Sequence, residues 1–190
     1  MRSFTSLHVR TQDADAVRAL ARRLRTPELA LYVAPDPPWY SLYDEGLEAD
    51  EDLARLWAAL EAASRLGRAA LFAVFEDEAL CWGLAEAGRV RYRFCEGVEG
   101  APSGPLGRLP ADLDPAAVAA AQVGEPKTAA VRALAGMLGI FPDHAVVGFG
   151  DLLELDGEGG LPQGVWVMED DAGPELVLER PVLEDDHAGG

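Results

Sequence analysis

The stretch that most constrains the fold is AALFAVF at residues 69–75, where every residue is apolar. Apolar side chains on both sides of a strand indicate that it is buried on both faces, in the middle of a sheet. As a helix, the run would be too short to cross a bilayer. The acidic residues 76–78 follow it and are typical of a turn. We therefore expect a central strand at 69–75.

The stretch after that turn, residues 79–97, predicts a β-hairpin. With a loop formed by residues 86–88, Gly88 would occupy the left-handed position that produces a bulge. The cross-strand pairs expected on one face are then Leu84–Val90, Trp82–Tyr92 and Leu80–Phe94. A two-residue loop would set Trp82 against Arg93 and mix the two faces, so the first register is preferred.

Cys81 and Cys95 lie on the other face of this predicted hairpin, together with Arg91 and Arg93. In the expected register Cys81 opposes Arg93 and is diagonal to Cys95. Their Cα atoms would be roughly 7 Å apart or more, which is poor geometry for a disulfide. We therefore expect two unlinked cysteines packed beneath a helix. A reactive thiol beside the guanidinium groups is the alternative.

Apolar periodicity and turn residues predict the other elements. The expected strands are residues 4–10, 29–34 and 39–44, and the expected helices are residues 13–25, 50–66, a short one from Asp114 onward, and 127–138. The stretch 141–157 is ambiguous between helix and strand.

This order, β-α-β-β-α-β-β-β and then helices, predicts a fold of the α+β class. We expect a single domain over residues 1–168, with a mostly antiparallel mixed sheet, helices packed on one face and a helical C-terminal third. Residues 169–190 are expected to form an acidic C-terminal segment that could hold a last hairpin and ends in a frayed stretch.

The charge of the chain limits its partners. The 190 residues include 33 acidic and 16 basic side chains, which gives a formal net charge of −17. Such a chain repels phosphate backbones and anionic lipid surfaces, so general nucleic-acid binding and membrane binding are disfavoured. Solubility alone explains an acidic bias, and a basic protein partner is the functional alternative.

Composition and the first residues also predict a setting. Lys127 is the only lysine, Ile140 is the only isoleucine and asparagine is absent, which indicates the codon bias of a GC-rich, bacterial genome. The opening MRSFTSLHVRT lacks the apolar core of a secretory signal. Two cysteines are too few for a disulfide framework. We expect a soluble, cytoplasmic protein.

No motif in the sequence identifies a reaction. His8, His144 and His187 are far apart, and no spacing typical of a zinc site occurs, so we expect no metal and no cofactor. GFGD at 148–151 lacks the third glycine of a dinucleotide loop. Catalytic residues stay unassigned. A hydrolase that uses carboxylates with His8 or His144 is the enzymatic alternative.

The stretch APDPP at residues 34–38 precedes two aromatic residues, Trp39 and Tyr40. Proline restricts the backbone, so the loop would lose little entropy on binding, and Trp and Tyr are favoured anchors at interfaces. We therefore take Asp36, Trp39 and Tyr40 as candidate binding residues. The competing interpretation is a stiff turn between strands, with one set of alternating aromatics in the core.

The sequence favours a non-catalytic protein-binding or adaptor domain that docks a basic protein through an acidic surface. The hydrolase described above is one alternative. The other is a neutraliser of a basic protein, such as a toxin or a nucleic-acid binder.

Overall fold

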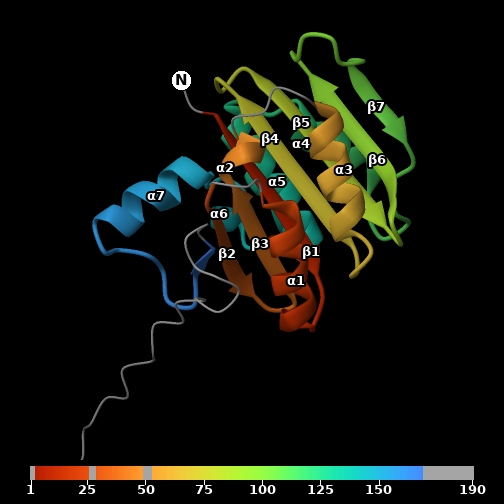
Figure 1. Cartoon of the computed structure of the whole chain (residues 1–190). Helices are drawn as coiled ribbons and strands as arrows, with labels where there is room; N and C mark the ends of the chain where they lie inside the picture. Colours follow the sequence, from red (N-terminus) through yellow and green to blue (C-terminus); the bar gives the residue numbers. More distant parts are fainter. Residues whose placement is uncertain (1–2, 26–28, 49–52, 169–190) are drawn as a thin grey trace, which may run out of the picture.

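The computed structural model describes residues 3–25, 29–48 and 53–168. Its centre is an eight-stranded antiparallel sheet with strand order β7-β6-β5-β4-β1-β3-β2-β8 (Figure 1). The strands are β1 Phe4–Arg10, β2 Leu31–Asp36, β3 Trp39–Asp44, β4 Ala69–Phe75, β5 Ala79–Glu86, β6 Arg89–Glu96, β7 Gly104–Gly107 and β8 Trp166–Met168. The α+β class and the antiparallel sheet are confirmed. The predicted C-terminal segment 169–190 lies outside the described residues.

The helices are α1 Ala14–Leu24, α2 Glu45–Glu48, α3 Leu53–Ala63, α4 Pro115–Gln122, α5 Lys127–Leu138, α6 Pro142–Ala145 and α7 Phe149–Gly157. Local chemistry sets several of their ends. The carboxylate of Asp13 accepts a hydrogen bond from the Ala16 amide (2.9 Å) at the start of α1, and Asp114 does the same for Ala116 (3.0 Å) in α4. Gly139 ends α5 in the left-handed conformation.

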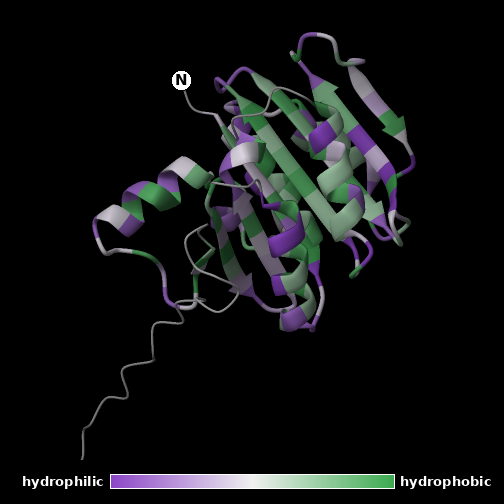
Figure 2. Ribbon diagram, viewed as in Figure 1, coloured by the Kyte–Doolittle hydropathy of each residue, from purple (hydrophilic) through white to green (hydrophobic). Residues whose placement is uncertain are grey.

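The sheet is covered on both faces, whereas the sequence predicted helices on one face. Alternate residues of β4 belong to different cores: Leu71 packs with residues of α1 and α3, and Phe72 packs with residues of α4, α5 and α6. Figure 2 shows the apolar central strands between these helices. The physical reason lies in the central strand itself, because a strand that is apolar on both faces needs cover on both.

The β5–β6 hairpin has the predicted faces but a different register. Its turn contains only Ala87 and Gly88, both at positive φ, so that Glu86 pairs with Arg89. The extra residue is placed inside β6 at Arg91, where the register shifts between the Ala85–Val90 and Leu84–Tyr92 pairs. Beyond this bulge every pair is two residues away from the predicted one. A shift of two keeps each side chain on its face but changes its partner.

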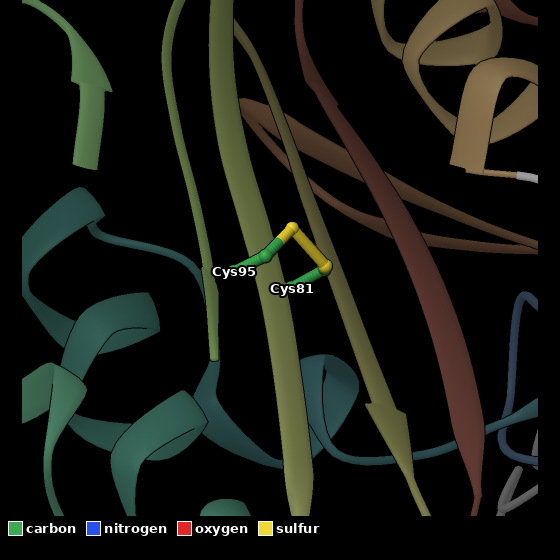
Figure 3. The surroundings of a disulfide bond; sticks show 2 residues. All are labelled: Cys81 and Cys95. Atoms are coloured by element: carbon green, nitrogen blue, oxygen red, sulfur yellow. A yellow bond between two sulfur atoms is a disulfide. The ribbon is translucent and has the colours of Figure 1, made fainter. Parts of the chain in front are cut away.

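This register places Cys81 directly opposite Cys95, and the two residues form a disulfide (Figure 3). Their Cα atoms are 4.2 Å apart, close to the spacing of directly opposed residues in an antiparallel ladder. The prediction of two unlinked cysteines is therefore wrong, and the displaced register is the reason.

Candidate functional site

The predicted recognition loop is shorter than expected, and its aromatic residues are buried. β2 ends at Asp36 and β3 begins at Trp39, so only Pro37 and Pro38 lie in the turn. Trp39 is 2% exposed and Tyr40 is 8% exposed. Trp39 packs in the core beneath α5, whereas Tyr40 packs in the core beneath α1. Because helices cover both faces, neither aromatic is available as an anchor, and the surface of the turn consists of half-buried Asp36 and the two prolines.

His8 lies in a buried polar network with two serines. Its Nδ1 is 2.8 Å from the Ser41 hydroxyl, and its Nε2 is 3.0 Å from the Ser6 hydroxyl. The Ser6 hydroxyl donates to the Ala145 carbonyl at 2.9 Å. Because that bond uses the only hydroxyl proton of Ser6, Nε2 of His8 must donate to Ser6 and Nδ1 must accept from Ser41. The network joins β1, β3 and α6.

Burial keeps His8 neutral and away from solvent. Desolvation first, and the neighbouring His144 second, lower the pKa of His8 from 6.5 to about 3. Both ring nitrogens are occupied by serine hydroxyls, and the side chain has no exposed surface. The imidazole therefore links the sheet to α6. In this conformation it has no contact with solvent, so a substrate bound at the surface could not transfer a proton to it.

His144 is half-buried at the end of α6, beside the β2–β3 turn. Burial lowers its pKa, and the carboxylates of Asp36 and Asp143 act in the opposite direction but do not outweigh it. Its ring meets the exposed Phe141 edge-on at 5.2 Å, and the Tyr43 hydroxyl donates to its carbonyl at 2.7 Å. His144 thus lies close enough to Asp36 for the two side chains to interact electrostatically. Trp39 and Tyr40 lie beneath the surface.

Helix α7 carries a surface that the sequence did not predict. Phe149 and Leu152 pack against Tyr32 and Tyr43 of the sheet, which fixes the inner side of the helix. Leu153 (53%) and Leu155 (37%) are exposed on the two opposite flanks of that inner side, because residues two apart point in different directions around a helix. Figure 1 shows α7 at the margin of the molecule, and Figure 2 shows apolar and polar residues intermixed along it.

The start of α7 is fixed by carboxylates. Glu48 of α2 accepts hydrogen bonds from the amides of Phe149 and Gly150, the latter at 3.0 Å. Asp151 accepts from the Gly148 amide at 2.9 Å. These carboxylates meet the positive end of the helix dipole, so the helix is held in a defined position relative to the sheet. Burial raises the pKa of Glu48, although the amides that it accepts from oppose that shift.

The segment that contains α7 has acidic residues but no basic residues to neutralise them. Residues 133–168 contain no lysine or arginine. They contain five acidic residues, namely Asp143, Asp151, Glu154, Asp156 and Glu158. Asp143 forms an ion pair with Arg132, whereas Glu154 and Glu158 are exposed next to the two leucines. We call Leu153, Glu154, Leu155 and Glu158 the α7 face.

The α7 face could have been found from two signals in the sequence. One is the long interval without a base, and the other is the apolar doublet pattern of DLLELDG, which leaves leucines on both sides of a helix. Neither signal could be assigned to a helix surface, because periodicity alone did not distinguish helix from strand in residues 141–157.

A small cavity lies next to the disulfide. Its volume is about 20 Å³, and its wall includes Cys95, Arg93, Trp57, Leu53, Ala101 and Leu106. Cys81 is fully buried on the other side of the disulfide, whereas Cys95 is 5% exposed. The cavity has room for roughly one water molecule.

Lys127 is a buried charged residue, with only 3% of its surface exposed. Its ammonium group lies 2.7 Å from carboxylates of both Glu96 and Glu125. Burial lowers the pKa of Lys127, but the two carboxylates outweigh it, so the pKa is raised overall. The charge is fully paired and ties the start of α5 to the end of β6, which gives it a structural role.

Neither metal ligation nor a membrane span is found in the described ranges. Within residues 3–25, 29–48 and 53–168, no group of three or more His, Cys, Asp or Glu side chains could hold a metal ion. Over the same ranges, no helix has the length and hydropathy needed to cross a bilayer.

Comparison with known proteins gives no relative: no protein-family model, curated protein or solved structure matches this chain.

Proposed function

We propose that this chain is a non-catalytic binding domain that docks a basic protein through the α7 face. The observation that carries the proposal is a pair of exposed leucines, Leu153 and Leu155, on a helix that has exposed acids and no basic residue. An isolated exposed leucine is ordinary, but two on one short helix among charges of a single sign resemble the anchors and rim of an interface.

The way α7 is held favours recognition by a preformed helix. Its inner side is fixed by Phe149 and Leu152, and its first turn is fixed by Glu48. A partner would therefore meet a helix that is already ordered, and the entropy lost on binding would be small. Because Leu153 and Leu155 lie on opposite flanks of α7, a partner's groove would have to enclose the outer side of the helix to contact both.

Charge selects the kind of partner. The chain has a net charge of −17, and the α7 face adds Glu154 and Glu158 around its leucines. Basic residues around an apolar groove would complement this surface and accelerate association at low ionic strength. A second copy of the chain would bring like charges together, so self-association through this face is disfavoured.

The test is capture of partners by the tagged full chain at low and high salt. A Leu153→Ser, Leu155→Ser double variant removes the apolar anchors, and Val123→Ser is the control because Val123 is 63% exposed just after the end of α4. We expect one stoichiometric basic protein to bind the parent and the control. Its affinity for the double variant should fall by about tenfold or more, as for loss of interface anchors.

Two results would contradict the proposal. One is a partner that binds the double variant as tightly as the parent. The other is a partner that is acidic or whose binding does not weaken with salt. A neutraliser of a basic toxin or nucleic-acid binder would use the same face, and the identity of the captured protein separates that function from an adaptor role.

A further inference from the structure

We propose that Cys95 and Cys81 form a reversible thiol pair that responds to hydrogen peroxide, with Cys95 as the reacting thiol and Cys81 as the resolving thiol. This inference is independent of the α7 face. It rests on the position of the pair in the sheet, on the difference in burial between the two residues, and on the cavity at Cys95.

The sheet holds the two residues together whether or not they are linked. The neighbouring pairs Trp82–Phe94 and Gly83–Arg93 belong to the same ladder, and β5 is held on its other side by β4. Reduction therefore leaves the two thiols facing each other across adjacent strands, at a Cα separation that permits the bond to form again. A sulfur that resolves an oxidised partner has to be poised in this way.

The two sulfurs differ in their access to small molecules. Cys81 has no exposed surface and packs in the core beneath α3, together with Leu60. Cys95 lines the cavity, and Arg93 lines it as well. A guanidinium favours the thiolate form of a nearby cysteine, and the thiolate is the nucleophile. The reaction with an oxidant is thus expected at Cys95.

The size of the cavity selects the oxidant. A volume of about 20 Å³ has room for roughly one water molecule. Hydrogen peroxide is only slightly larger than water, whereas glutathione disulfide and bulky organic hydroperoxides are several times larger. The chemical class that fits is a small hydroperoxide.

The oxidation of the two thiols by hydrogen peroxide takes place in two steps. The Cys95 thiolate attacks one oxygen of hydrogen peroxide, the O–O bond breaks, and the products are a sulfenic acid at Cys95 and hydroxide. The Cys81 thiol then attacks the Cys95 sulfur, which releases hydroxide that takes up the thiol proton as water, and the disulfide forms. Two electrons pass from the two sulfurs to the peroxide.

The return step needs a dithiol reductant, which is too large for the closed cavity and reaches the disulfide only when the cavity wall opens. Its thiolate attacks the Cys95 sulfur, Cys81 leaves and takes up a proton, and the second thiol of the reductant releases Cys95. The products are two protein thiols and the disulfide of the reductant. A leaving thiolate in an apolar core is unfavourable, so we expect reduction to be slower than oxidation. Such a bond is compatible with the predicted cytoplasmic location, where permanent structural disulfides are rare.

The first experiment identifies the reacting sulfur. The full chain is reduced with a phosphine, freed of it, treated briefly with hydrogen peroxide and then transferred into urea that contains dimedone, which traps the sulfenic acid once unfolding has opened the cavity. We expect Cys81→Ser to carry the adduct at Cys95, and Cys95→Ser to carry none. Cys81→Ala repeats the test in case a buried hydroxyl disturbs the core. An adduct at Cys81, or oxidation no faster than in the urea-unfolded chain, would refute the proposal.

The second experiment tests the cavity. Arg93→Gln should slow oxidation of the reduced chain by roughly fivefold through loss of a nearby positive charge. Arg91→Gln is the matched control, because Arg91 is exposed on the same strand and is not part of the cavity wall. Ala101→Leu should slow the reaction by filling the cavity, and Leu106→Ala should let tert-butyl hydroperoxide react faster. Equal rates in all four variants would rule out this cavity as the route.

Discussion

At the scale of single residues, the structure changes the meaning of Trp39 from a binding residue to a core residue. The side chain is 2% exposed and lies in the cluster beneath α5, where a Cβ on Gly139 would come within 4.0 Å of its indole nitrogen. We therefore expect Trp39→Ala to lower the free energy of unfolding by about 3–5 kcal/mol, as for other large-to-small core changes. Chemical denaturation measures this loss.

The control for that experiment is Val123→Ala, at a side chain that is 63% exposed. It should change the unfolding free energy by no more than about 0.5 kcal/mol. A loss of less than about 1 kcal/mol for Trp39→Ala would restore Trp39 as a surface residue and revive the recognition loop.

His8 predicts a pH dependence of stability. Its pKa is about 3 in the folded state and 6.5 in the ordinary state, so the unfolded chain takes up a proton in that range that the folded chain does not. The stability contribution is therefore complete above pH 6.5 and is lost as the pH falls toward 3. The slope can reach about 1.4 kcal/mol per pH unit.

The measurement compares the unfolding free energy of the parent chain and of His8→Gln between pH 7 and 4. Other groups titrate in both chains, so the difference between the two slopes isolates His8. We expect the parent to lose stability more steeply on acidification. Parallel slopes would mean that His8 takes up its proton over the same pH range in the folded and unfolded chains, so that its pKa is not lowered by folding.

Individual residues also show where the sequence was insufficient. It placed Cys81 and Cys95 on the correct face, because a face depends only on the period of two. It missed the disulfide, because the opposition of two residues depends on the length of the turn and on the bulge at Arg91. The prediction that Trp39 and Tyr40 bind a partner was wrong for a different reason. The two side chains lie on opposite faces of the sheet, so burying both requires helices on both faces. The local sequence does not show which helices pack on the sheet.

At the scale of elements, the β5–β6 turn contains a residue in an unfavourable conformation. Ala87 has φ 52°, a left-handed value that costs a side-chain-bearing residue about 1 kcal/mol or more, and Gly88 follows at φ 73°. Asn-Gly is the preferred pair for such a two-residue turn. We therefore expect Ala87→Asn to raise the unfolding free energy by about 0.5–1 kcal/mol, measured by thermal or chemical unfolding.

Ala87→Val provides the opposite change at the same position, because a β-branched side chain is poorly tolerated at positive φ. It should destabilise the chain. If Asn and Val shifted stability in the same direction, the left-handed conformation of Ala87 would not determine the stability of this turn.

The elements that the sequence predicted best are those with strong local signals. The helix starts at Asp13 and Asp114 and the stop at Gly139 follow from capping chemistry that acts within one turn. Helix α7 was left undecided, because its stability comes from Phe149 and Leu152 packing on distant strands and from Glu48 about a hundred residues earlier in the chain. The candidate site was missed for this reason.

At the scale of the whole molecule, charge acts in opposite directions on folding and on binding. A net charge of −17 disfavours the compact state through self-repulsion, which salt screens. Pairs of opposite charge, such as Arg68 with Asp112 at 2.6 Å and Lys127 with Glu96 at 2.7 Å, work against this trend, but Arg68–Asp112 is at the surface and contributes little. The repulsive contribution should therefore dominate the response to salt.

We accordingly expect the melting temperature of the isolated chain to rise between low and high sodium chloride. A gain of about 1 kcal/mol corresponds to roughly 2–4 °C for a chain of this size. Binding of a basic partner to the α7 face should weaken over the same range. Calorimetry in a salt series, with Leu153→Ser, Leu155→Ser as the control for binding, measures both. A melting temperature that falls with salt would show that the attractive ion pairs outweigh the repulsion. The excess acidic residues would then lie where they do not destabilise the fold and where a basic partner could neutralise them.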